Sequence, residues 1–234
     1  LKAVSKADIQ QLQKQADECV AAAVAFCTET KPTGKPAVRE ALWPKPETAL
    51  NGTRGKDLSG VSFVEAEDIP CTRQLKYSDA ISESIERWLK AEPTAFVLGE
   101  EVANFGGGPY GATKGLPPLY PDRILNTPIS ESGFCGLALG ASLNGMRPIV
   151  EIMFSSFALV AADQLFNQIA QIAHIYGAKP QVPLVARTRV GIGLGYGAQH
   201  SLDPVAIFSL FPGWRIFVPT TPFDYIGMFN AAMR

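Results

Sequence analysis

From Tyr77 to the end of the chain, short apolar runs alternate with segments whose apolar residues recur at helical spacing. This periodicity predicts strands at 95–98, 123–126, 148–153, 183–188 and 214–218, and helices at 78–91, 133–144, 157–175, 204–210 and 222–233. Apolar strands that alternate with helices are typical of a mainly parallel sheet with helices on both faces. Residues 76–234 are therefore predicted to form a three-layer α/β domain.

The first 75 residues follow a different pattern. A capping sequence that begins at Ser5 precedes apolar residues at helical spacing, which predicts one amphipathic helix over 6–29. Proline and glycine then accumulate, which favours an irregular linker over 31–75, with a basic partner-binding arm as the alternative. The sequence thus predicts a helix within 1–30, a linker and the α/β domain. Because the first methionine is Met146, we expect further protein on both sides of this sequence.

The charge balance argues against two classes of partner. With 21 basic and 22 acidic side chains, the formal net charge is -1, which offers no electrostatic footprint for nucleic acid or an anionic membrane. No apolar run approaches the ~18 residues that a membrane span needs. The four cysteines include no CxxC pair, so they are predicted to be free thiols of a cytoplasmic protein.

Polar residues that follow the predicted strands are the first candidates for chemistry, because open α/β sheets bind ligands at the carboxyl ends of their strands. Glu100 follows the strand at 95–98, and Glu131 begins a helix. Each could instead be a solvated loop acid or a first-turn acid favoured by the helix dipole. His200 lies in a glycine-rich loop and is a better candidate for proton transfer than His174, which is expected in the core.

Two glycine-rich loops resemble nucleotide-binding motifs only in part. Residues 106–115 lack the GK[ST] ending of a P-loop, so a flexible turn is the preferred interpretation. Residues 191–198 contain a loose GxGxxA, but neither an immediate helix nor an acidic residue ~20 positions further on completes a dinucleotide fingerprint. Neither loop is assigned to nucleotide binding.

Three motifs carry a resemblance to a known family: NTPISESG at 126–133, RPIVEIMFSSF at 147–157 and YGAQHS at 196–201. In order and spacing they resemble the β subunit of the thiamine-diphosphate-dependent, decarboxylating dehydrogenase component of 2-oxoacid dehydrogenase complexes. The GEE loop, GATKGL at 111–116 and DQLFNQ at 163–168 fit as well. The resemblance covers 77–234 and implies the pyrimidine-binding domain of a thiamine-diphosphate-binding fold. Residues 6–29 are more weakly similar to the last helix of the α subunit, which implies an α-β fusion.

The resemblance gives Glu131 a role in catalysis. The matching glutamate of the family hydrogen-bonds the N1′ atom of the cofactor's aminopyrimidine, and this contact promotes removal of the thiazolium proton. A carboxyl group donates such a hydrogen bond only when it is protonated, so we expect an apolar pocket around it. Ile129, Met153 and Phe157 could line that pocket.

Further roles follow from the same resemblance. Phe157 matches the aromatic residue that stacks on the pyrimidine ring, and Glu100 matches the first acid of the GEE loop. His200 matches a histidine near the reacting carbon, implicated in proton transfer during acyl transfer to lipoamide. Family members continue this motif as QHSQS, whereas this chain has QHSLDP at 199–204, which puts one polar contact to the substrate in doubt.

The resemblance also implies cofactors and partners. Thiamine diphosphate is expected with magnesium, whose ligands would lie in an α-type domain outside this segment. Leu184 and Ala232 align with a monovalent-cation site, such as one for potassium, that is built partly from backbone carbonyls. Expected partners are a lipoyl-bearing acyltransferase and a 2-oxoacid substrate, in a homo-oligomer. The C-terminal domain of the β subunit is absent, so this segment alone should be inactive.

Three alternatives fit the same residues. An acetoin dehydrogenase fits the same motifs, and the motifs do not select among pyruvate, branched-chain 2-oxoacids and acetoin. A transketolase-like enzyme shares the fold and the glutamate, although its loop motifs differ. A non-catalytic paralogue would keep the fold alone, and the joint presence of Glu131, Phe157 and His200 argues against it.

Overall fold

The computed structural model describes residues 5–42, 66–70, 73–108, 110–177 and 180–234. The chain forms two compact units, Leu1–Val61 and Ser62–Arg234, whose boundary falls within the segment predicted as a linker. Much of that linker, at 43–65 and 71–72, lies outside the described residues, as do Cys71 and Pro109.

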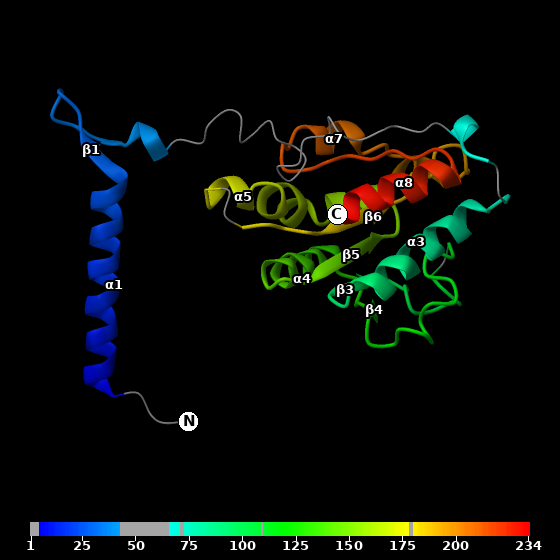
Figure 1. The fold of residues 1–234 in the computed structure, drawn as a ribbon, viewed down its shortest axis with the longest axis horizontal. Helices are drawn as coiled ribbons and strands as arrows, with labels where there is room; N and C mark the ends of the chain where they lie inside the picture. The colour runs from blue at the N-terminus through cyan, green and yellow to red at the C-terminus, as the bar shows by residue number, and fades with distance from the viewer. Residues whose placement is uncertain (1–4, 43–65, 71–72, 109, 178–179) are drawn as a thin grey trace. The chain divides into compact units, whose positions relative to one another are not determined.

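The first unit contains helix α1 (Lys6–Cys27), which confirms most of the helix predicted at 6–29 (Figure 1). The helix starts at a capping box, in which the Ser5 hydroxyl accepts the Asp8 backbone N–H at 3.1 Å and the Asp8 carboxylate accepts the Ser5 backbone N–H at 3.0 Å. These two bonds satisfy donors that the first helical turn would otherwise leave unpaired. None of the α1 residues is buried.

A short hairpin follows α1, where the sequence predicted the end of the helix and an irregular linker. Strand β1 (Thr28–Thr30) pairs antiparallel with β2 (Pro36–Val38), and η1 (Glu40–Leu42) is a short 3-10 helix. Gly34 adopts a φ of 75° in the connecting turn. Glycine accepts this left-handed conformation without a steric cost, so the local sequence permits the reversal.

The second unit is built on a four-stranded sheet in which all neighbouring strands are parallel. Its strands are β3 (Ala95–Gly99), β4 (Ile124–Asn126), β5 (Arg147–Ile152) and β6 (Val185–Thr188), in the order β4-β3-β5-β6. The register places Glu151 of β5 opposite both Gly99 and Arg187. The carboxyl ends of all four strands therefore lie at one edge of the sheet.

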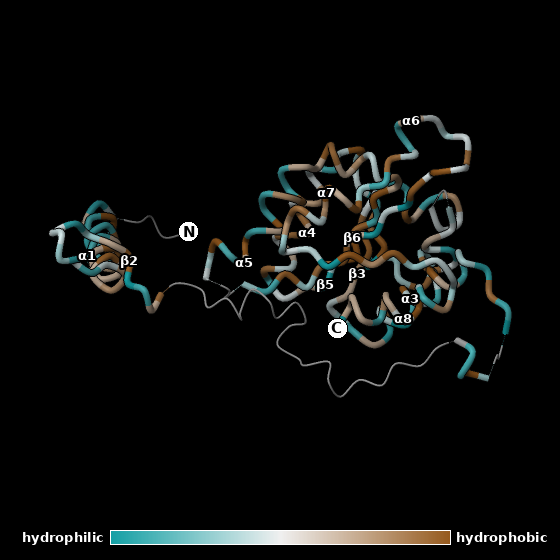
Figure 2. Tube along the Cα trace, turned by 90° about the horizontal axis from the view of Figure 1, so that it is seen from above, coloured by the Kyte–Doolittle hydropathy of each residue, from teal (hydrophilic) through white to brown (hydrophobic). Residues whose placement is uncertain are grey.

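Helices cover both faces of this sheet, which confirms the predicted three-layer α/β architecture (Figure 2). One face carries α3 (Tyr77–Ala91) and α8 (Pro222–Met233). The other carries α4 (Glu131–Leu143), the 3-10 helix η3 (Ser155–Leu159), the π-helix η4 (Asp163–Ile169) and α7 (Val205–Ser209). Short segments complete the unit: η2 (Ala66–Asp68), α5 (Ile172–Ile175) and α6 (Gly197–His200).

Strand β3 explains how the sheet supports two cores. Every residue of β3 is buried, and successive side chains point to opposite faces. Phe96 and Leu98 join the core under α4, whereas Ala95 and Val97 join the core under α3 and α8. A short, continuously apolar strand is what a parallel sheet covered on both faces requires.

Two predictions of secondary structure are wrong. Residues 214–218 form no strand, and the helix predicted at 157–175 is three short segments of different helix types. The Ala170 backbone N–H donates to the Leu165 carbonyl at 3.2 Å, which is the wide turn of a π-helix. Apolar spacing reports which side chains are buried, and it does not distinguish a regular helix from one that is wound unevenly. His174, expected in the core, is exposed on α5.

Candidate active site

The parallel sheet gathers the candidate residues because each of them follows the carboxyl end of a strand. Glu100 follows β3, Glu131 begins the helix after β4, Met153 follows β5, and His200 lies in the loop region after β6. This edge is where open α/β sheets bind their ligands.

Glu100 and Glu131 form a pair of buried acids, each only 7% exposed. Burial raises the pKa of Glu100, and the charge of Glu131 raises it further, while the Ser130 backbone N–H opposes the shift. Within the described residues, Oε1 of Glu100 is buried without a hydrogen-bond partner. A buried polar atom without a partner is costly, so its presence here indicates a site prepared for a polar ligand.

An aromatic cluster surrounds His200. Its imidazole stacks on the Phe154 ring with the centroids 4.2 Å apart, and it meets the Phe157 ring edge-on at 5.4 Å. Tyr196 also contacts Phe154, at 5.5 Å. Nδ1 of His200 is buried and has no hydrogen-bond partner in the described part of the chain. The rings therefore fix the imidazole while one of its nitrogens stays available for a proton or a ligand.

The loop that leads to His200 is closed at its base. The Gly191 backbone N–H donates to the His200 carbonyl at 2.8 Å, and a Cβ at position 191 would lie 2.3 Å from that oxygen. Only glycine permits this approach. Between these ends, a Cβ at Gly193, Gly195 or Gly197 would meet nothing within 4 Å.

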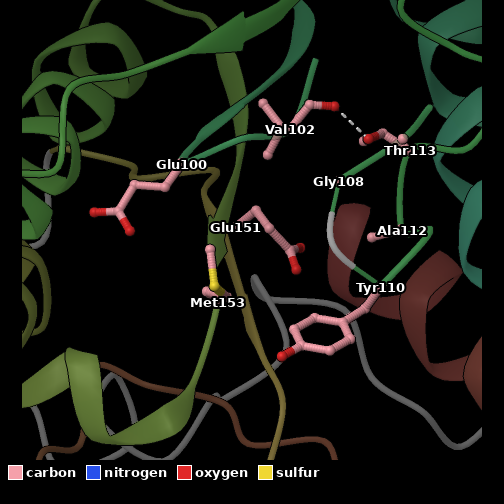
Figure 3. A pocket seen from close by; sticks show the side chains of 9 residues that line it. Glu100, Val102, Gly108, Tyr110, Ala112, Thr113, Glu151 and Met153 are labelled. Carbon is pink, nitrogen blue, oxygen red and sulfur yellow. Dashed lines mark hydrogen bonds between the residues drawn. The ribbon is translucent and has the colours of Figure 1, made fainter. Parts of the chain in front are cut away.

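A small cavity lies beside the acids (Figure 3). Its volume is about 10 Å³, close to the space that one water molecule needs. Figure 3 shows the Glu100 carboxylate on one side of Met153 and the Glu151 carboxylate on the other, with the Tyr110 ring on the Glu151 side in this view, and all four residues line the cavity. The remaining wall comes from the glycine-rich loop and its neighbours, namely Val102, Gly107, Gly108, Ala112 and Thr113.

The glycine-rich loop is a series of hydrogen-bonded turns. The Thr113 hydroxyl donates to the Val102 carbonyl, and the Thr113 backbone N–H donates to the Gly107 carbonyl at 3.1 Å. Gly107 has a φ of 134°, and a Cβ there would lie 2.2 Å from the Lys114 backbone nitrogen. The loop therefore needs glycine at position 107 for its close backbone packing.

The Gly107→Ala substitution is expected to lower the free energy of unfolding by at least about 2 kcal/mol, because it combines backbone strain with an overlap on the Lys114 backbone. Gly106→Ala is the matched control, since Gly106 also has a positive φ but open space around it. We expect it to cost about 1 kcal/mol. Urea unfolding of the full chain measures both, and equal losses would contradict the packing argument.

An ion pair between two strands lies beneath this edge. Both Glu151 oxygens accept hydrogen bonds from Arg187, with Nε at 2.6 Å, and each side chain is only 13% exposed. Burial disfavours the charged guanidinium, but the Glu151 carboxylate outweighs burial and raises the pKa of Arg187. The pair connects neighbouring strands, since Glu151 lies on β5 two residues before Met153 and Arg187 lies on β6 two residues before Arg189.

The remaining residues predicted for the site lie at different distances from the cavity and the aromatic cluster. Met153 lines the cavity, and Phe157 is half-buried in the aromatic cluster. Ile129 is 84% exposed, so its side chain does not shield Glu131 within this chain, contrary to expectation. Leu184 directly precedes β6, and Ala232 lies in the last turn of α8.

No group of three or more His, Cys, Asp or Glu in the described ranges could hold a metal ion. The cation site assigned to the carbonyls of Leu184 and Ala232 is of a different kind and stays a prediction. Sequence reasoning overlooked Phe154, although it lies in the same motif as Met153 and Phe157, and it overlooked Tyr110.

Comparison with known families identifies this arrangement. Residues 73–234 match the family model described as transketolase, pyrimidine binding domain. The chain belongs to this family. The match covers the whole four-stranded sheet, both acids and the aromatic cluster, and it confirms the domain predicted from the three motifs.

Relatives of this chain include β subunits of two kinds of enzyme. The β subunit of the acetoin:2,6-dichlorophenolindophenol oxidoreductase of Cupriavidus necator is 39% identical over an alignment of 171 residues, and the match covers 69% of this chain and 51% of the relative. The pyruvate dehydrogenase E1 component β subunit of Gracilaria tenuistipitata var. liui is 39% identical over 157 residues, covering 67% and 48%. The resemblance to such β subunits is therefore confirmed. The chain spans about half the length of these relatives.

A solved structure supports the fold. The chain described as split gene transketolase, inactive beta4 tetramer, aligns with a TM-score of 0.53 at 21% identity, covering 67% of this chain and 47% of that one. Among the described residues, no helix is long and apolar enough to cross a membrane. Relatives include proteins named as mitochondrial and chloroplastic, so the cytoplasmic location stays a prediction.

Proposed function

We propose that this chain is the pyrimidine-binding half of a thiamine-diphosphate-dependent 2-oxoacid dehydrogenase, which decarboxylates a 2-oxoacid and transfers the acyl group to lipoamide. The observation that carries the proposal is the buried acid Glu131 beside Glu100 at the ligand-binding edge of a domain from the pyrimidine-binding family. The β subunits of pyruvate dehydrogenases among its relatives support the substrate class.

The residues present fit thiamine diphosphate. A pyrimidine offers ring nitrogens and a flat face, and this edge offers buried carboxyl groups and the half-buried ring of Phe157. Oε1 of Glu100, which is buried without a partner within the described residues, adds a free acceptor. When bound, the cofactor supplies the carbanion stabilisation that protein side chains lack.

In this proposal each residue has a limited task. Glu131 would hold a proton at a ring nitrogen of the pyrimidine, and its burial would keep water from competing for that hydrogen bond. Phe157 orients the ring by its flat face. His200, fixed by its stacking on Phe154, moves a proton to or from the substrate side. The ligands for magnesium and the diphosphate come from an α-type domain outside the described residues.

His200→Gln is expected to slow acyl transfer to lipoamide by about 100-fold, because glutamine cannot exchange a proton in the physiological range. Decarboxylation measured with an artificial electron acceptor should change much less. The assay compares both reactions in the complete enzyme, with His174→Gln as the matched control because that imidazole is exposed on α5. Equal slowing of both reactions would assign His200 a structural role.

The second candidate function is an acetoin dehydrogenase. Two relatives, from Cupriavidus necator and Bacillus subtilis, are β subunits of acetoin:2,6-dichlorophenolindophenol oxidoreductases and are 39% and 37% identical. The site residues named above would serve either substrate, since the cofactor performs the bond cleavage in both.

A substrate panel tests the two candidates. The complete gene product, assembled with its α-type domain, is incubated with thiamine diphosphate, magnesium, an artificial electron acceptor and either 2-oxoacids or acetoin. Carbon dioxide release that depends on the cofactor supports the 2-oxoacid dehydrogenase. Reduction of the electron acceptor when acetoin, but no 2-oxoacid, is the substrate supports the second candidate. Absence of turnover with every substrate would overturn both and favour a non-catalytic paralogue.

The partners belong to the same proposal. We expect a cytoplasmic homo-oligomer that also binds a lipoyl-bearing acyltransferase, because one chain provides only part of the cofactor site. Light scattering of the complete protein measures its mass, and a monomer would contradict the oligomer.

A further inference from the structure

Arg189 follows β6 and lies against three aromatic rings. Its guanidinium carbon is 3.6 Å from the centre of the Tyr110 ring, 5.4 Å from that of Phe154 and 5.7 Å from that of Tyr196. Rings hold a guanidinium by its flat faces, so the N–H groups around its edge stay available as donors. Within the described ranges, the Arg189 side chain makes neither an ion pair nor a hydrogen bond.

The charges nearby leave Arg189 without a counter-ion. Burial raises the pKa of Glu151 and the charge of Arg189 opposes this shift, but both oxygens of Glu151 are already bound by Arg187. Glu100 and Glu131 form no ion pair with Arg189. Within the described residues, Arg189 therefore remains a guanidinium without an ion-pair partner.

The position of Arg189 connects it to the candidate active site. Tyr110, on which it stacks, lines the cavity that Met153 and Glu100 also line (Figure 3). Phe154 contacts both Arg189 and His200, at 5.4 Å and 4.2 Å, so the guanidinium carbon and the imidazole centre are at most about 10 Å apart. A small substrate that reaches His200 would thus come close to an unpaired guanidinium.

We propose that Arg189 recognises the carboxylate group next to the ketone of the 2-oxoacid substrate. The proposal rests on the function proposed above and adds a residue that selects the acid. A planar guanidinium edge binds a carboxylate through two parallel hydrogen bonds, a geometry that a lysine ammonium does not reproduce. Uncharged acetoin has no carboxylate for this paired, charged contact.

The test measures ligand binding and kinetics in the complete, cofactor-loaded enzyme. Calorimetry compares oxamate, which carries the carboxylate of a 2-oxoacid, with its uncharged amide analogue oxamide. For Arg189→Gln we expect the Kd of oxamate and the KM of the 2-oxoacid to rise about 10- to 100-fold, with the Kd of oxamide unchanged. Arg189→Lys should give an intermediate rise, because it keeps the charge and loses the paired geometry.

The controls separate recognition from folding. Arg87→Gln removes the same charge from the exposed side of α3 and should leave both ligands unaffected. An unchanged KM and Kd in Arg189→Gln, or equal weakening of oxamate and oxamide, would overturn the role of Arg189 while leaving the proposed function intact. A wild-type enzyme that turns over no 2-oxoacid would instead overturn the proposed function.

Discussion

Replacing Glu131 with glutamine should lower carbon dioxide release by the complete enzyme by about 10²- to 10⁴-fold. Glutamine has nearly the same shape, so the side chain fits the same buried position, but it cannot hold or release a proton. The loss should appear in kcat more than in KM, since a hydrogen bond that assists proton removal acts in the transition state. The measurement is the rate with a saturating 2-oxoacid at several concentrations of thiamine diphosphate.

Asp122→Asn is the control for this prediction. It removes a carboxylate from an exposed turn of the same unit and should leave the rate unchanged. A Glu131→Gln enzyme that retains its rate within threefold would mean that the motif alignment, and with it the assignment of Glu131, is wrong. If excess thiamine diphosphate fully restores the rate of the Glu131→Gln enzyme, Glu131 contributes to cofactor binding and not to the chemical step.

Replacing Arg187 with methionine should cost about 3 to 5 kcal/mol of the free energy of unfolding, because it leaves the Glu151 carboxylate buried without its partner. This is the largest effect on stability that we expect from a single change in the domain. Urea unfolding of the full chain measures it. Lys90→Met removes one partner of an exposed ion pair on α3, and we expect no measurable change there.

A double variant tests the cause of this loss. Glu151→Leu together with Arg187→Met replaces the pair with apolar side chains, which removes the uncompensated charge. The double variant should therefore be more stable than Arg187→Met alone. If both variants are equally unstable, packing between the strands and not the unpaired carboxylate would account for the loss.

The secondary structure of the domain could be predicted from the sequence where buried apolar residues recur at a regular spacing. The helix at 78–91 and the strand at 95–98 were predicted within one residue of α3 and β3, because their apolar residues face a core continuously. The segment at 214–218 is also rich in apolar residues, yet it has no neighbouring strand in the described sheet. An apolar run becomes a strand only where a partner supplies its hydrogen bonds, and sequence periodicity does not report the partner.

The candidate site was predictable only in part. Glu131 and His200 could be found because they lie in motifs whose order matches a family. Arg189 could not, because its significance depends on Tyr110, which is 79 positions earlier in the chain, and on the Arg187 side chain that neutralises Glu151. An arginine without an ion-pair partner is a property of the folded arrangement and has no local sequence pattern.

The closed base of the loop from Gly191 to His200 has an evolutionary consequence. The backbone of His200 is anchored to the first residue of the loop, and the side chains of Ile192 and Leu194 are exposed, so these two residues can change without displacing the imidazole. The glycines between Gly191 and His200 adopt positive φ, and Tyr196 contacts the Phe154 ring, so those positions are constrained. Selection could therefore alter these two exposed side chains while the imidazole of His200 stays in place. A library that randomises positions 192 and 194 would sample this variation without disturbing the rings around His200.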